Sequence, residues 1–248
     1  MTSFLALSCF FDTFPGKPED DTVDIWRANL DQSPETVSGL KRLLSFEEKA
    51  RADRFRFPAY QSRFIVSHGI LRKILSCYLR IAPEGIFYFA NDHGKPGIGG
   101  RYGGGGVRFN LSHSYDRAVY AVATGREVGI DIEYLWRKSD IAKIAGRFFT
   151  PVESETIAKL PAAIRKKAFF TCWTRKEAFL KATGCGLALS PRRFEVSVLP
   201  EDPPALVHTD WDSTGHLKWS LANIDAKGDY IAALAVEGRF SELRYFDV

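Results

Sequence analysis

The stretch FNLSHSYDRAVYAVATG, Phe109–Gly125, decides the fold prediction for this chain of 248 residues, because a later stretch repeats its pattern. The later stretch is WSLANIDAKGDYIAALAVEG, Trp219–Gly238. Both contain a polar turn with an aspartate next to an aromatic residue, then a strand rich in alanine and valine, then a glycine. A helical segment and a strand precede each of them. The repeat predicts an α+β fold of two pseudo-symmetric halves, each an antiparallel sheet packed against a long helix, with the active site in the cleft between them.

The join between the two halves is expected near residues 124–127. This gives an N-terminal half of residues 1–124 and a C-terminal half of residues 125–248. The apolar start, residues 1–11, is expected to be a strand. Apolar side chains recur at helical spacing in four segments: 26–57, 62–80, 141–148 and 152–181.

Composition excludes several classes of protein. Apolar residues make up 45% of the chain, enough for a substantial core, but no apolar run approaches the roughly 20 residues of a membrane span. The apolar start lacks the basic residues of a secretory signal. The four cysteines are scattered without a CxxC pair, which argues against a zinc site or a disulfide framework and favours the cytoplasm. A net charge of +4 favours an anionic ligand or an acidic protein partner, and is too small to indicate nucleic acid.

Two carboxylates follow each other in VGIDIEYL, the next strand after the first repeat. Because strand side chains alternate, Asp131 and Glu133 share one face, while Ile130 and Ile132 share the other. Neighbouring anions on a strand repel each other by up to about 1 kcal/mol, so they require a cation or full exposure to solvent. An ordinary exposed strand face is one explanation, and a bound cation is the other.

The stretch WTRKEAFLK, which begins at Trp173, places Glu177 and Lys181 on one face of a helix. A surface ion pair worth about 0.3–0.5 kcal/mol would explain them. However, Trp173 lies on the same face, which places Glu177 at the margin of a core or a cleft. If Glu177 meets Asp131 and Glu133, the three carboxylates form an oxygen-only site that suits magnesium or manganese and not zinc.

A magnesium ion held by carboxylates usually completes its shell with water and substrate phosphates, so the sequence should also supply cations for a phosphate. The candidates are Lys181, Lys95 in a GKP turn, Arg51, Arg54 and Arg63. His113 could donate a hydrogen bond to a phosphate, with Ser112 adding a hydroxyl. These two neighbours do not indicate a serine hydrolase, because the GxSxG motif is absent.

Two sequence blocks carry a family resemblance. GIDIE (Gly129–Glu133) fits the pattern G-I/V-D-I/V-E, and WTRKEAFLKATGCGL (Trp173–Leu187), about 40 residues later, fits W-x-x-K-E-A/S-x-x-K. FNLSHS, GKP and RFFTPVESE look like further blocks of the same family. The chain therefore resembles the 4'-phosphopantetheinyl transferases, and its length resembles their large, surfactin-synthetase-activating type, a single chain with two pseudo-symmetric halves.

The resemblance implies an enzyme that transfers the 4'-phosphopantetheine arm of coenzyme A to a serine of an apo acyl or peptidyl carrier protein. Adenosine 3',5'-bisphosphate would be released. It also implies magnesium, or manganese in its place, as cofactor and a cytoplasmic monomer as the working form. The expected partners are acidic carrier proteins of fatty acid, polyketide or nonribosomal peptide synthesis, with no nucleic acid and no membrane.

By position in the family blocks, the metal ligands would be Asp131, Glu133 and Glu177. The coenzyme A contacts would be Arg63, Lys95, Ser112, His113, Asp131, Glu177 and Lys181. The catalytic residues would be Glu177, Lys181 and His113, and either Glu177 or a metal-bound water would take the proton of the serine. One departure is Glu48, which stands where the family usually has a lysine.

Two other functions remain open at this point. A divalent-metal-dependent nucleotide pyrophosphatase would use the same metal and phosphate chemistry, but it would consume coenzyme A without a carrier. A non-catalytic carrier-binding module would keep the fold, but it would not need Glu177 and Lys181 together.

Overall fold

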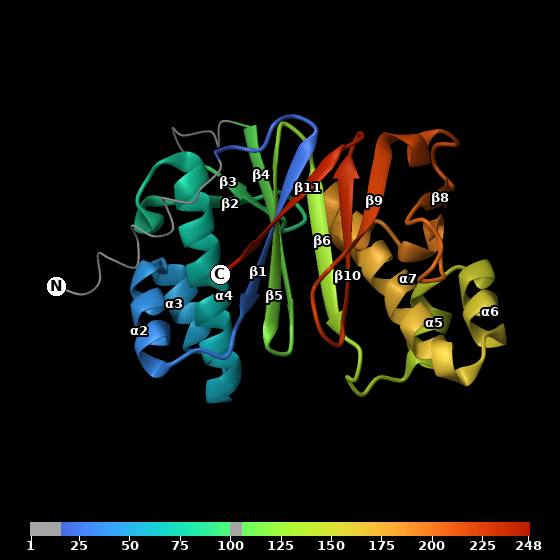
Figure 1. The fold of residues 1–248 in the computed structure, drawn as a ribbon, viewed down its shortest axis with the longest axis horizontal. Coiled ribbons are helices and arrows are strands. Elements are labelled where there is room, and N and C mark those ends of the chain that lie inside the picture. Colours follow the sequence, from blue (N-terminus) through green and yellow to red (C-terminus); the bar gives the residue numbers. More distant parts are fainter. Residues whose placement is uncertain (1–15, 100–105) are drawn as a thin grey trace.

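The computed structural model describes residues 16–99 and 106–248 (Figure 1). The strand expected at residues 1–11 lies outside the described residues. The helices are α2 (Pro34–Leu43), α3 (Phe46–Ala52), α4 (Pro58–Leu79), α5 (Ile141–Phe148), α6 (Pro151–Lys159) and α7 (Ala162–Thr183). The strands are β1 (Thr22–Asn29), β2 (Tyr88–Ala90), β3 (Pro96–Ile98), β4 (Val107–Ser114), β5 (Arg117–Thr124), β6 (Val128–Tyr134), β7 (Phe194–Val196), β8 (Leu206–Thr209), β9 (Trp219–Ile224), β10 (Tyr230–Glu237) and β11 (Glu242–Asp247). Within the described ranges, no helix has the length and apolar character needed to cross a membrane.

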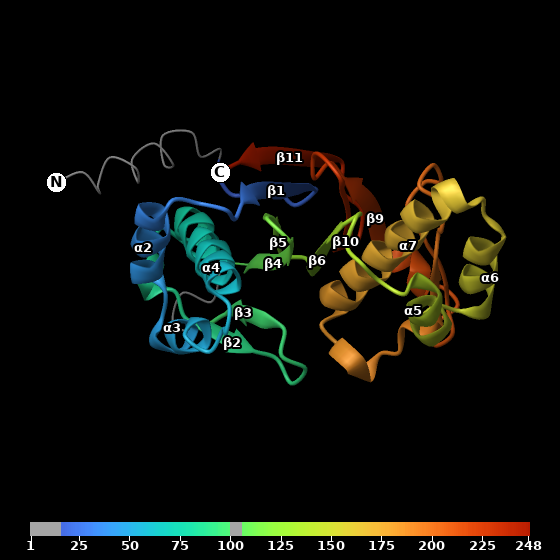
Figure 2. The ribbon, with the colours of Figure 1, turned by 90° about the horizontal axis from the view of Figure 1, so that it is seen from below.

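Two sheets stand at the centre, with helices outside each of them (Figures 1 and 2). The first sheet has the strand order β11-β1-β5-β4, and the second has the order β6-β10-β9. One apolar core, which includes Tyr120, lies between α4 and the first sheet, and another, which includes Phe179, lies between α7 and the second sheet. A third core, which includes Ile130, joins the two sheets. The mixed α+β class predicted from the sequence is confirmed.

Two helix predictions are wrong in their bounds. The segment expected to be helical from residue 26 begins within β1. The strand was mistaken for a helix because it is buried on both faces. Trp26 packs in the core beneath α4 and Ile25 in the core between the sheets, so consecutive apolar residues hide the alternation typical of a strand. The single helix expected over residues 152–181 is two helices, α6 and α7, which are separated by Leu160 and Pro161.

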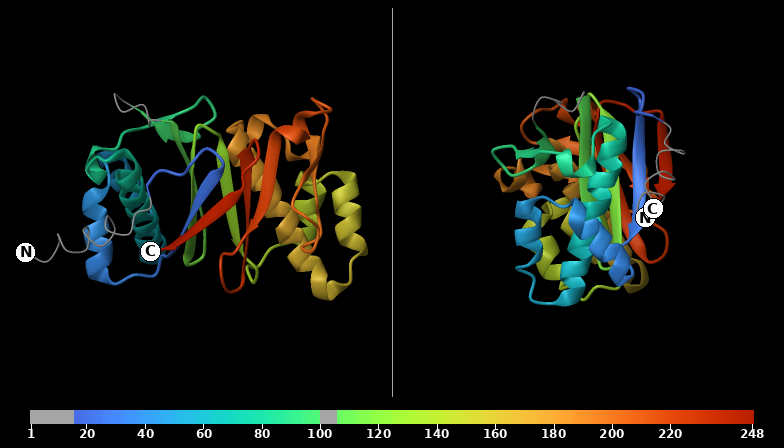
Figure 3. Two further views of the ribbon diagram at one scale, coloured as in Figure 1. Left: turned by 45° about the horizontal axis from the view of Figure 1, so that its top comes forward. Right: turned by 90° about the vertical axis from the view of Figure 1, so that its left-hand side faces the viewer.

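The final strand, β11, joins the first sheet although it follows β10 of the second. It lies beside β1 (Figure 3) and pairs with it in parallel. Thr22 is opposite Glu242, and Arg27 is opposite Asp247. The Arg244 guanidinium donates two hydrogen bonds to the buried Asp24 carboxylate, at 2.7 and 3.0 Å. The last strand therefore ties the C-terminal residues to the first sheet, across the predicted boundary at residues 124 and 125, and that boundary stays a prediction.

Gly129 in β6 allows α7 to lie directly on the second sheet. A β-carbon at this position would lie 2.2 Å from the carbonyl oxygen of Ala178 and 2.3 Å from the backbone nitrogen of Ala182. Real β-carbons do not approach backbone so closely, so only glycine fits here. This close approach brings the C-terminal half of α7 against the strand that carries Asp131 and Glu133.

Candidate active site

The two sheets meet where β4 of the first lies beside β6 of the second. The side-chain oxygens of Asn110, Ser112 and Ser114 accept hydrogen bonds from alternate backbone N–H groups of β6, at 2.9, 3.4 and 3.0 Å. Side chains of one strand thus replace the backbone partners that the edge of β6 lacks. The alternating Asn, Ser and Ser of the FNLSHS block therefore fix β6 in register beside β4.

Asp131 and Lys181 form the centre of the site. The Lys181 ammonium lies 2.7 Å from Asp131 Oδ1 and 2.9 Å from Ser112 Oγ, and Ser112 Oγ in turn donates to Asp131 Oδ1. The second carboxylate oxygen of Asp131, Oδ2, is buried and has no hydrogen-bond partner. Burial raises the pKa of Asp131, although Lys181 opposes this shift. One oxygen of Asp131 is therefore available to a further ligand.

Glu133 lies on the same face of β6, as the alternation of the strand predicted. Ser114 donates a hydrogen bond of 3.0 Å to one of its oxygens, and the Arg137 guanidinium donates one of 2.5 Å to the other. Arg137 was not among the residues predicted for the site. Its only signal in the sequence is its position, four residues after Glu133 and just beyond the end of the strand.

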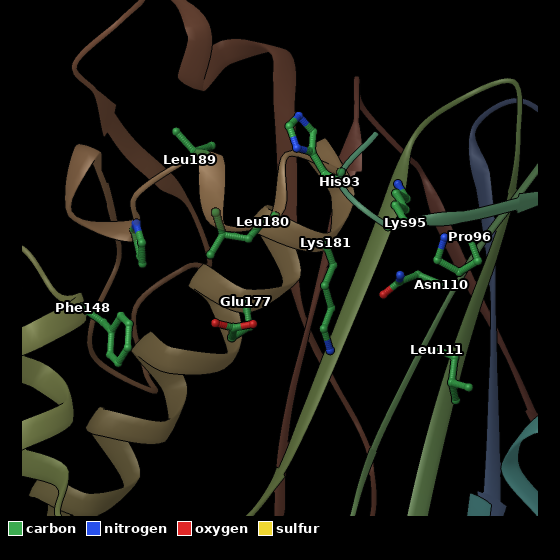
Figure 4. Close-up of a pocket in the computed structure, with 14 residues that line it drawn as sticks. His93, Lys95, Pro96, Asn110, Leu111, Phe148, Glu177, Leu180, Lys181 and Leu189 are labelled. Carbon is green, nitrogen blue, oxygen red and sulfur yellow. The ribbon is translucent and has the colours of Figure 1, made fainter. Parts of the chain in front are cut away.

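Glu177 faces a cavity of about 370 Å³, one helical turn before Lys181. Figure 4 shows its carboxylate near Phe148 and Leu180, with the Lys181 side chain extending toward the strands. Burial raises the pKa of Glu177 to about 7, and the nearby negative charges of Asp131 and Glu133 contribute to this rise. A carboxyl group with this pKa can accept a proton near neutral pH. Glu177 was predicted to lie at the margin of a core or a cleft, and it lines a cavity.

His113 lies where two further cavities adjoin. One, of about 620 Å³, is lined by Arg63, Asp131, Glu133 and Lys181, and the other, of about 440 Å³, is lined by Arg51 and His68. Burial lowers the pKa of His113, and the positive charges of Lys181, Arg51 and Arg63 lower it further. The region is therefore rich in positive charge.

Arg63 and Glu48, two residues of this region, already have strong partners. The Arg63 guanidinium donates two hydrogen bonds to Asp31, at 2.8 and 3.0 Å, which raise the pKa of Arg63. Glu48 completes the capping box of α3 with Ser45, and one of its oxygens lies 2.6 Å from the buried guanidinium of Arg72. Glu48 thus neutralises a buried arginine, which gives a structural reason for the departure from the family pattern.

Lys95 connects the turn between β2 and β3 to the end of α7. Its ammonium donates hydrogen bonds to a carboxylate oxygen of Glu127 at 2.5 Å and to the carbonyl oxygen of Ala182 at 2.8 Å. In the same turn, the side-chain amide of Asn91 donates to the carbonyl oxygen of Gly184 at 2.9 Å. A lysine at a helix C-terminus also complements the helix dipole. These bonds hold the segment just after Lys181.

The lysine inside the second signature block, Lys176, is structural. Its ammonium is fully buried and lies 2.8 Å from Glu153, 2.8 Å from the carbonyl oxygen of Pro191 and 2.6 Å from that of Phe194. Arg175, also buried, donates hydrogen bonds to a loop at residues 197–202. The signature block therefore combines residues that hold α7 in place with residues that face the cavities.

The side chains as they stand do not yet enclose a metal ion. Within residues 16–99 and 106–248, no three His, Cys, Asp or Glu side chains lie close enough to hold one. Lys181 bonds to Asp131 and Arg137 bonds to Glu133, so cations already balance two of the three predicted ligands. The free oxygen of Asp131 and the buried carboxyl of Glu177 nevertheless fit an oxygen-only donor set.

A cluster of carboxylates and a lysine, next to cavities lined by arginine and histidine, has the charged groups needed to bind a phosphate. The model of the 4'-phosphopantetheinyl transferase superfamily matches residues 127–235. The 4'-phosphopantetheinyl transferase HetI of Nostoc sp. is 41% identical over 218 residues, which cover 88% of this chain and 89% of that protein. The 4'-phosphopantetheinyl transferase psf-1 of Bacillus pumilus is 36% identical over 68% of this chain and 70% of its own length. A crystal structure of Thermotoga maritima holo-(acyl-carrier-protein) synthase aligns with 46% of this chain and 63% of its own, at 26% identity and a TM-score of 0.35.

The chain belongs to the 4'-phosphopantetheinyl transferase superfamily, a family of transferases, as its two signature blocks predicted. Within the site, Asp131, Ser112 and Lys181 contact one another directly. Glu177 lines one cavity, His113 lines another, and Lys181 lines both. Sequence reasoning missed Asn110, Ser114 and Arg137.

Proposed function

We propose that this protein transfers the 4'-phosphopantetheine arm of coenzyme A to a serine of an apo acyl or peptidyl carrier protein, with release of adenosine 3',5'-bisphosphate. The observation that carries the proposal is the position of Lys181. Its ammonium donates hydrogen bonds to Asp131 and Ser112 at the junction of the two sheets. Lys181 also lines both the cavity that contains Glu177 and the one that contains His113. A pyrophosphate beside Lys181 would have carboxylates on one side and arginine and histidine on the other.

The cavities offer separate places for the parts of coenzyme A. Arg51 and His113 border the cavity of about 440 Å³, where Phe109 and Tyr88 provide aromatic walls. This combination suits an adenine ring with a phosphorylated ribose. We assign the phosphate contacts to His113, Ser112 and Lys181, with Arg63 contributing charge from its position beside Asp31. Lys95 contributes by holding the turn that lines the cavity.

Asp131, Glu133 and Glu177 are the residues that would hold magnesium, with manganese as a substitute. The ion, when bound, supplies positive charge to the pyrophosphate oxygens and so favours attack on phosphorus. Lys181 and Arg137 would then exchange their carboxylate contacts for phosphate or solvent. Removing the divalent ions with a chelator should abolish transfer, and adding magnesium back should restore it.

The reaction needs one proton acceptor. The serine oxygen of the carrier forms a bond to the phosphorus atom that bears pantetheine, and the bond from this phosphorus to the bridging pyrophosphate oxygen breaks. Adenosine 3',5'-bisphosphate leaves with the electron pair of that bond. Glu177, with a pKa of about 7, is the group we assign to take the serine proton. Lys181 would stabilise the charge that develops on the leaving oxygen.

We further propose that the working form is a cytoplasmic monomer whose two pseudo-symmetric halves, residues 1–124 and 125–248, form the site between them. The core between the two sheets is consistent with two halves packed within one chain, so no second copy is needed to build the cavities. Cys77 and Cys172 are free and buried, which suits a reducing compartment.

The discriminating experiment supplies coenzyme A and magnesium with and without an apo-carrier and follows the nucleotide product. Transfer predicts adenosine 3',5'-bisphosphate only when an apo-carrier is present, in a one-to-one ratio with modified carrier. Release of nucleotide in the absence of any carrier would instead indicate a pyrophosphatase. If neither nucleotide nor modified carrier forms, a non-catalytic module would be the better description.

A further inference from the structure

Exposed aromatic side chains line the mouth of the cavity that contains Asp131. Phe57 and Tyr60, at the start of α4, are 56% and 57% exposed, and Tyr115, in the turn between β4 and β5, is 60% exposed. Tyr60, Tyr115 and the exposed Phe55 line the cavity itself. The start of α4 and the end of β6 lie at the same end of the molecule, the lower edge in Figure 1. Aromatic rings gathered at one edge of a cavity are typical of a binding surface.

The most exposed of these rings, that of Tyr115, is held in one orientation. Tyr115 has a φ of 54°, in the left-handed region that residues other than glycine rarely adopt. Its ring stacks on Tyr134 with centroids 5.2 Å apart and planes inclined by 17°. The Arg63 guanidinium lies 4.5 Å from the ring centroid. A ring fixed in this way loses little freedom when a partner binds, so the surface is preorganised.

The two residues that flank Phe55 in the sequence carry positive charge. Arg54 and Arg56 are exposed, and no carboxylate of the described ranges forms an ion pair with either of them. The carboxylates of Asp31, Asp53 and Asp116 each bond to another side chain. The field at the rim is therefore set by arginine, and it favours an acidic partner.

We propose that the docking face, which consists of residues 54–57, Tyr60 and Tyr115, is the surface that receives the acidic apo-carrier protein. This inference rests on the proposed function. The carrier serine must reach a phosphate beside Lys181, and two of the cavities reach Lys181. Of these two, the cavity of about 620 Å³ is lined by the exposed rings of Phe55, Tyr60 and Tyr115, and Arg54 and Arg56 flank Phe55 in the sequence. Aromatic residues and arginine carry much of the binding energy at protein interfaces.

Two variants and one control test the docking face. The aromatic variant is Phe57→Ser with Tyr60→Ser, and the charge variant is Arg56→Glu, at an arginine that is not among the candidate phosphate contacts. The control is Leu217→Ser, at a side chain 71% exposed in the short 3-10 helix Gly215–Lys218 that precedes β9. Each protein is checked for an unchanged melting temperature, and its kcat and its KM for apo-carrier and for coenzyme A are then measured at low and high salt.

Both test variants should raise the KM for the apo-carrier about tenfold or more, because exposed aromatic and arginine anchors dominate such interfaces. Their kcat at saturating carrier and their KM for coenzyme A should stay within about twofold of the unmodified protein, as should every value of the control. The charge variant should also show a weaker dependence of the carrier KM on salt.

Three results would overturn the inference. The first is a carrier KM that changes by less than about twofold in both variants while the unmodified protein loads the carrier normally. The second is an effect of the aromatic variant alone, which would exclude an acidic partner. The third is a failure of the unmodified protein to load any apo-carrier, which would remove the proposed function and, with it, the docking face.

Discussion

Replacing Lys176 by methionine separates the structural part of the second signature block from its chemical part. The Lys176 ammonium and the Glu153 carboxylate are almost completely buried, with exposed fractions of 1% and 2%. Methionine keeps much of the length of the side chain but removes its charge and its hydrogen bonds. Glu153 would keep its hydrogen bonds from the backbone of Thr150 and Val196, but it would have no charge partner.

The size of the effect follows from this burial. Breaking a buried ion pair by removing one partner typically costs about 3–5 kcal/mol, because the remaining charge is buried without compensation. For a chain of this length, each kcal/mol corresponds to roughly 2–4 °C in melting temperature. Lys176→Met should therefore lower the melting temperature by roughly 6–20 °C.

Thermal and urea unfolding, followed by circular dichroism, would measure this loss. The matched control is the double variant Lys176→Met with Glu153→Gln, which removes both charges, keeps a side-chain oxygen to accept a backbone hydrogen bond, and should recover part of the stability. At a temperature where the single variant is still folded, it should retain transferase activity, because Lys176 lies outside the cavities. A loss of less than about 1 kcal/mol in the single variant would refute the reasoning.

Three further perturbations test other contacts. Lys95→Met should lower kcat about tenfold, because the Lys95 ammonium at the end of α7 positions Lys181. Lys95→Arg keeps the positive charge and should retain most of the activity. Full activity of the methionine variant would contradict this role. Gly129→Ala should destabilise the protein by about 1–3 kcal/mol or more, since its methyl group would meet the backbone of α7, and an unchanged unfolding curve would show that α7 can move away. Burial lowers the pKa of His68 to about 4, whereas an unfolded histidine titrates near 6.5. The unfolded chain therefore binds this proton first, and the free energy of unfolding should fall by up to about 3 kcal/mol as the pH drops from 6.5 to 4, a fall that His68→Gln should remove if the histidine is its cause.

The reacting groups were predictable because they follow local periodicity. The period of two in a strand places Asp131 and Glu133 on one face, and the period of a helix places Glu177 beside Lys181. Both relations hold in the structure, since each depends only on its own element.

The residues that hold these groups in place were harder to predict, because their roles depend on which elements meet. Asn110 and Ser114 bond to the backbone of β6, and nothing in β4 alone shows that β6 will lie beside it. Lys176 belongs to a residue type that is almost always exposed, so its burial follows from the positions of Glu153 and the loop after α7. The pairing of β11 with β1 spans the whole chain and has no local signal.

The most direct measurement is the mass of an apo-carrier after incubation with coenzyme A, magnesium and the protein. The unmodified protein should add one phosphopantetheine arm to the carrier serine. Asp131→Ala and Glu177→Gln should add none, while circular dichroism should show that both remain folded. A carrier loaded at the unmodified rate by either variant would contradict the assignment of the carboxylate and lysine site as the place of transfer.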